Sequence, residues 1–252
     1  PDPTVKRQTG FLIPTLSDSG NTGSSLTIPY FKVLAINKDL TLKPRIYANN
    51  NILIQNEYRH VEKNSSHILD LGIFTSELNN NEETSKSHFF SNSKINFKEN
   101  FFENTNLEIN LEQVSNDTYL KKFQPTSSLI NNQNLMHNFI KVDGYSVDSS
   151  LSVEVEVFED LTKPNSDRYQ FVYPNVNFSK KLTHENIPGS FDLSSNLYQS
   201  HFETNKYTQS LSTDLMFNAD TKFNKYGLVK DFQILFKNPN KINKTGKNNE
   251  SD

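Results

Sequence analysis

Apolar and polar residues alternate one by one along much of this chain, and that pattern leaves few folds open. In residues 107–112 (LEINLE) and 151–158 (LSVEVEVF) the apolar side chains share one face of an extended strand and the polar side chains share the other. In all, strand-like runs lie at residues 9–16, 24–34, 39–48, 51–62, 66–77, 87–98, 105–114, 134–143, 145–158, 168–178, 190–202, 207–218 and 228–237, and in the run at 190–202 Phe191, Leu193 and Leu197 share one face. The connections are unequal: we expect a tight turn at Asp143-Gly144 and a long polar loop at residues 116–133. We therefore expect an all-β protein, an antiparallel up-and-down meander of about thirteen long strands.

The length of these runs favours a membrane barrel. Runs of about ten residues exceed the usual globular strand and suit a tilted crossing of a bilayer. Only 34% of residues are hydrophobic and the mean hydropathy is -0.67, yet 12% are aromatic. A barrel wall combines these values, because each strand needs only one apolar face. A soluble β-sandwich with one hydrated face shows the same alternation and remains an alternative.

Composition and motifs exclude several other functions. The net charge of -3 is spread along the chain and predicts no nucleic-acid surface. Cysteine is absent, the six histidines show no metal-ligand spacing, and no nucleotide-binding or nucleophile motif is present. We therefore expect no enzyme activity, no cofactor and no metal. Some carboxylates alternate with apolar residues, which indicates a polar lumen face rather than a catalytic pair: Glu108, Glu112, Glu154, Glu156 and Asp192.

Three prolines are evenly spaced in the N-terminal region. Pro14, Pro29 and Pro44 are fifteen residues apart, and a turn centred near residues 21–22 would bring the first two opposite each other. We expect a row of prolines across the first three strands, with a register error of about two residues. Because proline donates no ladder hydrogen bond, such a row would weaken the first strands. The alternative is that the prolines only end strands or lie at bulges.

Four short motifs at hairpin spacing resemble the start of the barrel domain of the LPS-assembly protein (LptD/OstA) family. The matching residues are Arg7, Thr9, Gly10, Phe11, Leu12 and Pro14 in the first run, Pro29, Tyr30 and Phe31 in the second, Asp39, Thr41 and Pro44 in the third, and Glu57, Tyr58 and Arg59 in the fourth. Beyond residue 62 the resemblance is limited to strand rhythm and scattered aromatic residues. The second strand lacks the family's tryptophan, and Lys43 stands where threonine is common.

The resemblance implies a place and a function. It implies an open, curved half of a large transmembrane β-barrel in the outer membrane of a Gram-negative bacterium, with residues 1–252 a partial barrel domain that lacks a periplasmic domain and closing strands. The family inserts lipopolysaccharide (LPS) into the outer leaflet through a lateral gate at the first barrel strand. Pro14, Pro29 and Pro44 would lie at that gate.

The resemblance also implies partners. These are LPS, outer-membrane lipid, a plug lipoprotein of the LptE type in the lumen, and a periplasmic bridge protein of the LptA type that contacts the missing domain. Two other functions remain open from the residues alone: another outer-membrane barrel, such as a porin or receptor, and a soluble β-sandwich that binds carbohydrate or acts as an adhesin.

Overall fold

The computed structural model describes residues 7–76, 84–203 and 206–244, and these residues form mainly β-strands. The first eight strands are β1 (Gly10–Phe11), β2 (Thr15–Ser19), β3 (Gly23–Thr27), β4 (Tyr30–Ala35), β5 (Lys38–Tyr47), β6 (Ile52–Val61), β7 (Ser65–Ser76) and β8 (Thr84–Phe97). The others are β9 (Asn104–Val114), β10 (Leu135–Tyr145), β11 (Ser149–Asp160), β12 (Tyr169–Thr183), β13 (Gly189–Phe202), β14 (Lys206–Ala219), β15 (Lys222–Phe223), β16 (Val229–Lys230) and β17 (Gln233–Lys244). A short α-helix, α1 (Tyr119–Phe123), and a 3₁₀ turn, η1 (Asn165–Arg168), interrupt them.

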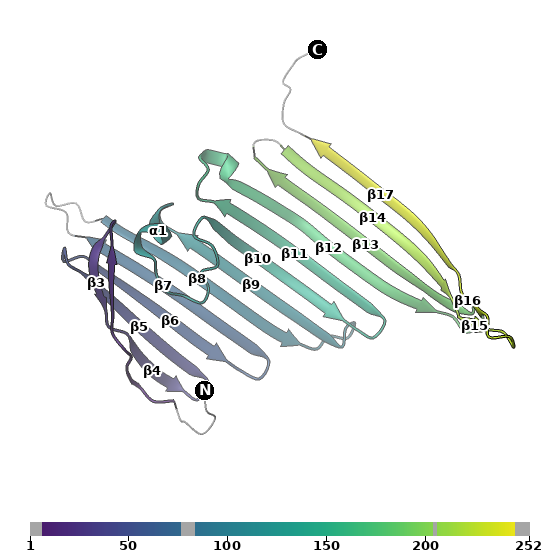
Figure 1. Ribbon diagram of the computed structural model, residues 1–252, viewed down its shortest axis with the longest axis horizontal. Helices are drawn as coiled ribbons and strands as arrows, with labels where there is room; N and C mark the ends of the chain where they lie inside the picture. Colours follow the sequence, from purple (N-terminus) through teal and green to yellow (C-terminus); the bar gives the residue numbers. More distant parts are fainter. Residues whose placement is uncertain (1–6, 77–83, 204–205, 245–252) are drawn as a thin grey trace, which may run out of the picture. The chain divides into compact units, whose positions relative to one another are not determined.

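The strands form a meander, as the alternation predicts. One 15-stranded sheet follows the order β1-β4-β5-β6-β7-β8-β9-β10-β11-β12-β13-β14-β17, with β2 and β3 attached beside β5 (Figure 1). Within the described residues no ladder joins β17 to β1, so the sheet is open. Apart from it, the part of the chain that the structure describes contains only the two-stranded sheet of β15 and β16. A β-sandwich needs a second large sheet to cover the first, so this topology argues against the sandwich alternative.

The expected runs match the strands of the large sheet closely. Two of them, at 9–16 and 24–34, are each divided into two strands, and a proline divides both. Pro14 lies between β1 and β2, and Pro29 lies between β3 and β4. Each proline therefore divides one expected strand into two. Each of the other expected runs coincides with one strand, except the run at 228–237, which covers β16 and the start of β17.

The sheet comprises two compact units. The first contains residues 1–95, 108–138 and 159–163, and the second contains residues 96–107, 139–158 and 164–252. In the first unit, β5 pairs with β6 so that Pro44 is opposite Ile54 and Thr41 is opposite Glu57. Neighbouring residues therefore separate into an apolar face with exposed Ile54 and a polar face with buried Glu57.

The second unit shows the same separation. Phe191 is opposite Phe217, and Leu193 is opposite Leu215, on one face of β13 and β14. On the other face Asn196 is opposite Ser212. Because the registers run unbroken along the two strands, the alternation read from the sequence becomes two continuous surfaces.

The first unit has a hydrophobic core, and it lies on the polar face of the sheet. Residues 115–134, here called the 115–134 segment, connect β9 to β10 and contain α1. The core consists of Tyr119, Leu120 and Phe123 of α1 with Tyr47, Leu53, Phe74, Phe90, Met136 and Leu161. The sequence predicts only a long polar loop at residues 116–133, so α1 is a correction. Its cause is a patch of apolar side chains on a face that is otherwise polar.

One further local expectation is wrong. Asp143-Gly144 does not form a turn, because both residues belong to β10, and the turn closes three residues later with a 2.8 Å hydrogen bond from Ser146 N to Ser149 O. A Cβ at Gly144 would lie 2.5 Å from the Phe102 ring, which explains a glycine inside the strand. Among the helices of the described residues, none has the length and apolarity required to cross a membrane.

Candidate functional site

The first strands are joined by incomplete ladders. Leu12 N donates a 2.9 Å hydrogen bond to Pro29 O, so these residues face each other in the pairing of β1 with β4. In an antiparallel ladder a hydrogen-bonded pair normally exchanges two bonds. Proline has no N–H, and the Leu12 carbonyl therefore receives none from Pro29.

The same defect recurs one strand further into the sheet. Ile28 N donates a 3.0 Å hydrogen bond to Pro44 O, and Pro44 has no N–H to return to Ile28. Leu12 stands two residues from Pro14, and Ile28 one residue from Pro29. The prolines are therefore not paired directly, but the offsets lie within the expected register error. Pro14 and Pro29 end short strands, whereas Pro44 lies inside β5.

The charged motif residues converge on the polar face beside these breaks. Arg7 Nη1 lies 2.8 Å from Asp39 Oδ2, and Arg59 Nε lies 2.8 Å from Asp39 Oδ1. Glu57 accepts a 2.9 Å hydrogen bond from Lys43 Nζ and lies 3.6 Å from Arg59 Nε. Residues that the sequence places in three separate motifs thus form one ion-pair network. Asp39 is 2% exposed and is its centre, a role that the motifs alone do not reveal.

The remaining motif residues either take part in backbone pairing or lie on the apolar face. Thr9 Oγ1 accepts a 3.0 Å hydrogen bond from Val33 N, and Gly10 is opposite Phe31. Phe11 and Tyr30 pack edge to face with ring centroids 5.0 Å apart. Tyr58 is opposite Leu69 on β7, one residue out of step with Glu57 and Arg59, so it belongs to the apolar face.

The 115–134 segment is held on the polar face by hydrogen bonds from β5 and β6. Arg45 Nη1 donates to Phe123 O at 2.6 Å. Lys43 Nζ donates to Thr126 O at 2.9 Å, and Gln55 Nε2 donates to the same oxygen at 3.0 Å. Arg45 thus satisfies a carbonyl at the C-terminal end of α1, and Lys43 and Gln55 satisfy a carbonyl in the loop that follows it. The segment therefore covers part of the polar face next to the first strands.

A series of hydrogen-bonded, buried polar side chains also fixes α1. Asp70 Oδ1 lies 3.2 Å from His88 Nε2, and His88 Nδ1 lies 2.9 Å from the Tyr119 hydroxyl. Because the Asp70 carboxylate can only accept, a neutral His88 carries its proton on Nε2 and accepts from Tyr119 at Nδ1. Burial, together with the nearby Tyr47 and Asp70, raises the pKa of Tyr119 above its ordinary value, so the hydroxyl remains a donor.

Substituting Gly72 by alanine is expected to displace the 115–134 segment. A Cβ at this position would lie 2.3 Å from His88 Cε1 and 2.9 Å from the Tyr119 hydroxyl, both in a tightly packed interior. Overpacking of this kind costs about 1–3 kcal/mol. Hydrogen exchange of residues 116–134 measures the effect, and Gly20→Ala, where a Cβ meets nothing within 4 Å, is the matched control. Equal exchange in the two variants would contradict the docking role of Gly72.

The acidic residues expected on a polar face occupy both units. In the first unit, Glu108 contacts Asn92 and Lys94, and Glu112 accepts a 2.9 Å hydrogen bond from His137 N. In the second unit, Asp192 accepts a hydrogen bond from Asn218. Glu154 and Glu156 lie in β11 of the second unit. Their pairing with amides and cations is typical of a hydrated structural surface.

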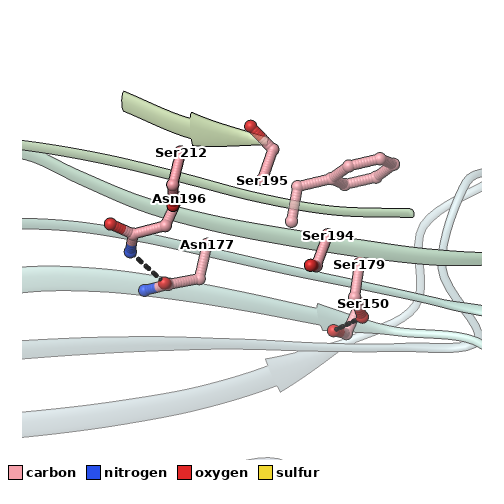
Figure 2. Close-up of a pocket in the computed structure, with 8 residues that line it drawn as sticks. Ser150, Asn177, Ser179, Ser194, Ser195, Asn196 and Ser212 are labelled. Carbon is pink, nitrogen blue, oxygen red and sulfur yellow. Dashed lines mark hydrogen bonds between the residues drawn. The ribbon is translucent and has the colours of Figure 1, made fainter. Parts of the chain in front are cut away.

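The second unit has a shallow pocket of about 210 Å³ lined by serine hydroxyls, asparagine amides and Phe178 (Figure 2). Ser150 Oγ and Ser179 Oγ lie 2.8 Å apart, and Asn196 donates to Asn177 at 2.5 Å. Ser194 lies beside Ser179 in the pairing of β13 with β12. The lining has no charged side chain. It can offer neutral donors and acceptors to a hydroxylated ligand but has no nucleophile–base arrangement.

Fold and surfaces together define a class of protein. A long antiparallel meander with one apolar and one polar face is typical of the wall of a large transmembrane β-barrel. The incomplete N-terminal ladders and the 115–134 segment are additional features of this sheet.

The comparisons with known proteins agree with this class. The chain is 24% identical to the LPS-assembly protein LptD of Pseudomonas entomophila over 229 residues, which cover 90% of the chain and 23% of that protein. It is 28% identical over 141 residues to the LptD of Legionella pneumophila, covering 52% of the chain and 17% of the relative. It is 43% identical over 60 residues to the LptD of Pseudomonas savastanoi, covering 24% of the chain and 6% of the relative.

The resemblance predicted from the N-terminal motifs is therefore confirmed. It extends over most of this chain, whereas the chain spans about a fifth of the length of the curated relatives it matches. No protein-family model matches the chain.

Proposed function

We propose that this chain forms part of an outer-membrane barrel that inserts LPS into the outer leaflet by opening laterally at its first strand. The observation that supports this most directly is the pair of half-made ladder contacts, Leu12–Pro29 and Ile28–Pro44. The similarity to proteins named for LPS assembly supports LPS as the substrate.

The prolines reduce the free energy needed to open the edge. A ladder hydrogen bond contributes about 0.5–1.5 kcal/mol net in water, and more in lipid, where water cannot replace it. Pro29 removes one such bond between β1 and its neighbour, and Pro44 removes one between β5 and the segment that joins β3 to β4. Pro14 separates β1 from β2, so the first strand meets β4 through two ladder residues. Pro14, Pro29 and Pro44 are the residues of the proposed gate.

The two faces of the sheet suit the two halves of a glycolipid. The polar face carries Glu108, Glu112, Glu154, Glu156 and Asp192, and the neutral pocket of the second unit adds serine and asparagine groups for sugar hydroxyls. The opposite face exposes large apolar side chains that would contact the bilayer and acyl chains, among them Ile54, Ile73, Leu211 and Phe236.

The proposed partners follow the resemblance. A plug lipoprotein of the LptE type would occupy the lumen, and a bridge protein of the LptA type would deliver LPS to a periplasmic domain of the same protein. Transport of this kind requires no reaction at the barrel, so we propose no enzyme activity and no cofactor. The proposed location is the outer membrane of a Gram-negative bacterium.

Depletion of the protein in its own host tests this function. Newly labelled LPS is expected to stop reaching the cell surface and to accumulate inside the envelope, and a plasmid copy of the gene is expected to restore delivery. If depletion leaves surface LPS unchanged but reduces uptake of a small solute, the protein is a porin or receptor instead. Depletion of an unrelated outer-membrane barrel is the control for general damage to the envelope.

A further inference from the structure

The backbone holds the first strand weakly, which raises the question of what keeps it in place. β1 has two ladder residues, Gly10 and Phe11. Beyond them, Leu12 N binds Pro29 O, and Val33 N binds the side chain of Thr9. An interaction outside the ladder would therefore have a large share in holding this strand.

Arg7 makes such an interaction. It precedes β1, and its Nη1 lies 2.8 Å from Asp39 Oδ2 on β5, although β4 is the strand that pairs with β1. The ion pair thus connects the edge strand to the second strand away from it. On the same face Lys43 bonds to Glu57 and to Thr126 O, neither of which belongs to the first strands.

The geometry makes Arg7 the member that can leave. Asp39 is 2% exposed, and its Oδ1 remains paired with Arg59 Nε at 2.8 Å when Arg7 is withdrawn. The buried carboxylate would therefore not be left without a partner, which is the costly outcome for a buried charge. Arg7 is 57% exposed, so water and salt can replace its contact easily.

We propose that Arg7 is an electrostatic latch for the first strand, with Asp39 as its fixed receptor and Arg59 as the residue that keeps Asp39 paired when the latch is open. Arg7 is a positioning residue in this role. The biological use of the movement rests on the proposed function, whereas the latch itself is a property of the sheet.

Hydrogen exchange of the complete protein, purified from the cell envelope in detergent, tests the latch. Arg7→Gln is expected to raise the exchange of the Leu12 and Val33 amides by up to about fivefold at low salt, the range of an exposed ion pair. High salt is expected to raise exchange in the parent protein and to change it little in Arg7→Gln, because the latch is already lost. Arg7→Lys, which keeps the charge, is expected to retain the salt dependence.

Lys94→Gln is the matched control. Lys94 is also 57% exposed and pairs with Glu108 at 3.1 Å between β8 and β9. This variant is expected to leave exchange at Leu12 and Val33 unchanged. Asp39→Asn removes the receptor and is expected to raise the exchange of the Leu12 and Val33 amides at least as much as Arg7→Gln does. Because Asp39 is buried and Arg7 is exposed, only the Arg7 variant leaves the interior undisturbed.

Three results would overturn the latch: parent-like exchange in Arg7→Gln, salt dependence that persists in that variant, or the same increase in Lys94→Gln. Failure of the latch can be distinguished from failure of the proposed function. If Arg7→Gln loosens the first strand while depletion leaves surface LPS unchanged, the latch stands and the LPS role does not.

Discussion

Alanine at positions 29 and 44 together is expected to slow the delivery of LPS to the cell surface by roughly 5- to 150-fold. Each substitution supplies an N–H where the structure has none, one facing the Leu12 carbonyl and one facing the Ile28 carbonyl. Two restored ladder bonds contribute about 1–3 kcal/mol to the closed edge, and more where the edge lies in lipid. The closed state is then favoured over the open one by that amount.

Pulse-labelled LPS that reaches the outer surface measures this effect, with the amount of barrel protein held equal. Pro239→Ala is the matched control, because Pro239 lies in β17 opposite Ser212, in the second unit. It restores a donor away from the first strands and is expected to leave delivery unchanged. If the Pro29→Ala, Pro44→Ala double variant delivers LPS at the parent rate, the prolines do not contribute to the gate.

Phe123→Ala is expected to release the 115–134 segment from the sheet. The Phe123 ring is buried, with its centroid 4.1 Å from that of Phe74 and 5.1 Å from that of Tyr119. Truncation of a buried phenylalanine costs about 3–5 kcal/mol, and here it removes a central part of the packing between the segment and the sheet. We therefore expect the segment to detach while the strands beneath it remain paired.

Trypsin provides a direct assay, because Lys121 and Lys122 lie within α1. Both are expected to resist cleavage in the parent protein and to be cleaved rapidly in Phe123→Ala. The control is Phe101→Ala, since Phe101 is 86% exposed and its removal leaves no interior cavity. Resistance to trypsin in Phe123→Ala would show that the hydrogen bonds from Arg45, Lys43 and Gln55 suffice to hold the segment.

Strand identity was predictable because it depends on local spacing. In β13 and β14 the residues read as one face, Phe191, Leu193 and Leu197, do lie opposite Phe217, Leu215 and Leu211. A strand repeats every two residues, so side chains that alternate in the sequence must separate onto two faces. The resemblance to LptD was also visible locally, in motifs that precede residue 62.

The candidate site was only partly predictable. The motifs identified Arg7, Asp39 and Arg59 but not their meeting, because those contacts depend on how the strands pair; Asp39 is opposite Arg59 in the register of β5 with β6. The 115–134 segment was read as a polar loop, although Tyr119, Leu120 and Phe123 are the signal that could have revealed α1. Their partners, including Tyr47, Phe74 and Phe90, come from distant strands.

The sequence by itself determined the strands, their two faces and the family resemblance, since these follow from periodicity and short motifs. Tertiary structure alone decided which residues face each other: Leu12 with Pro29, Arg7 with Asp39, and α1 with the polar face. The physical reason is that a one-residue change of register alters every cross-strand contact without changing the alternation along the chain.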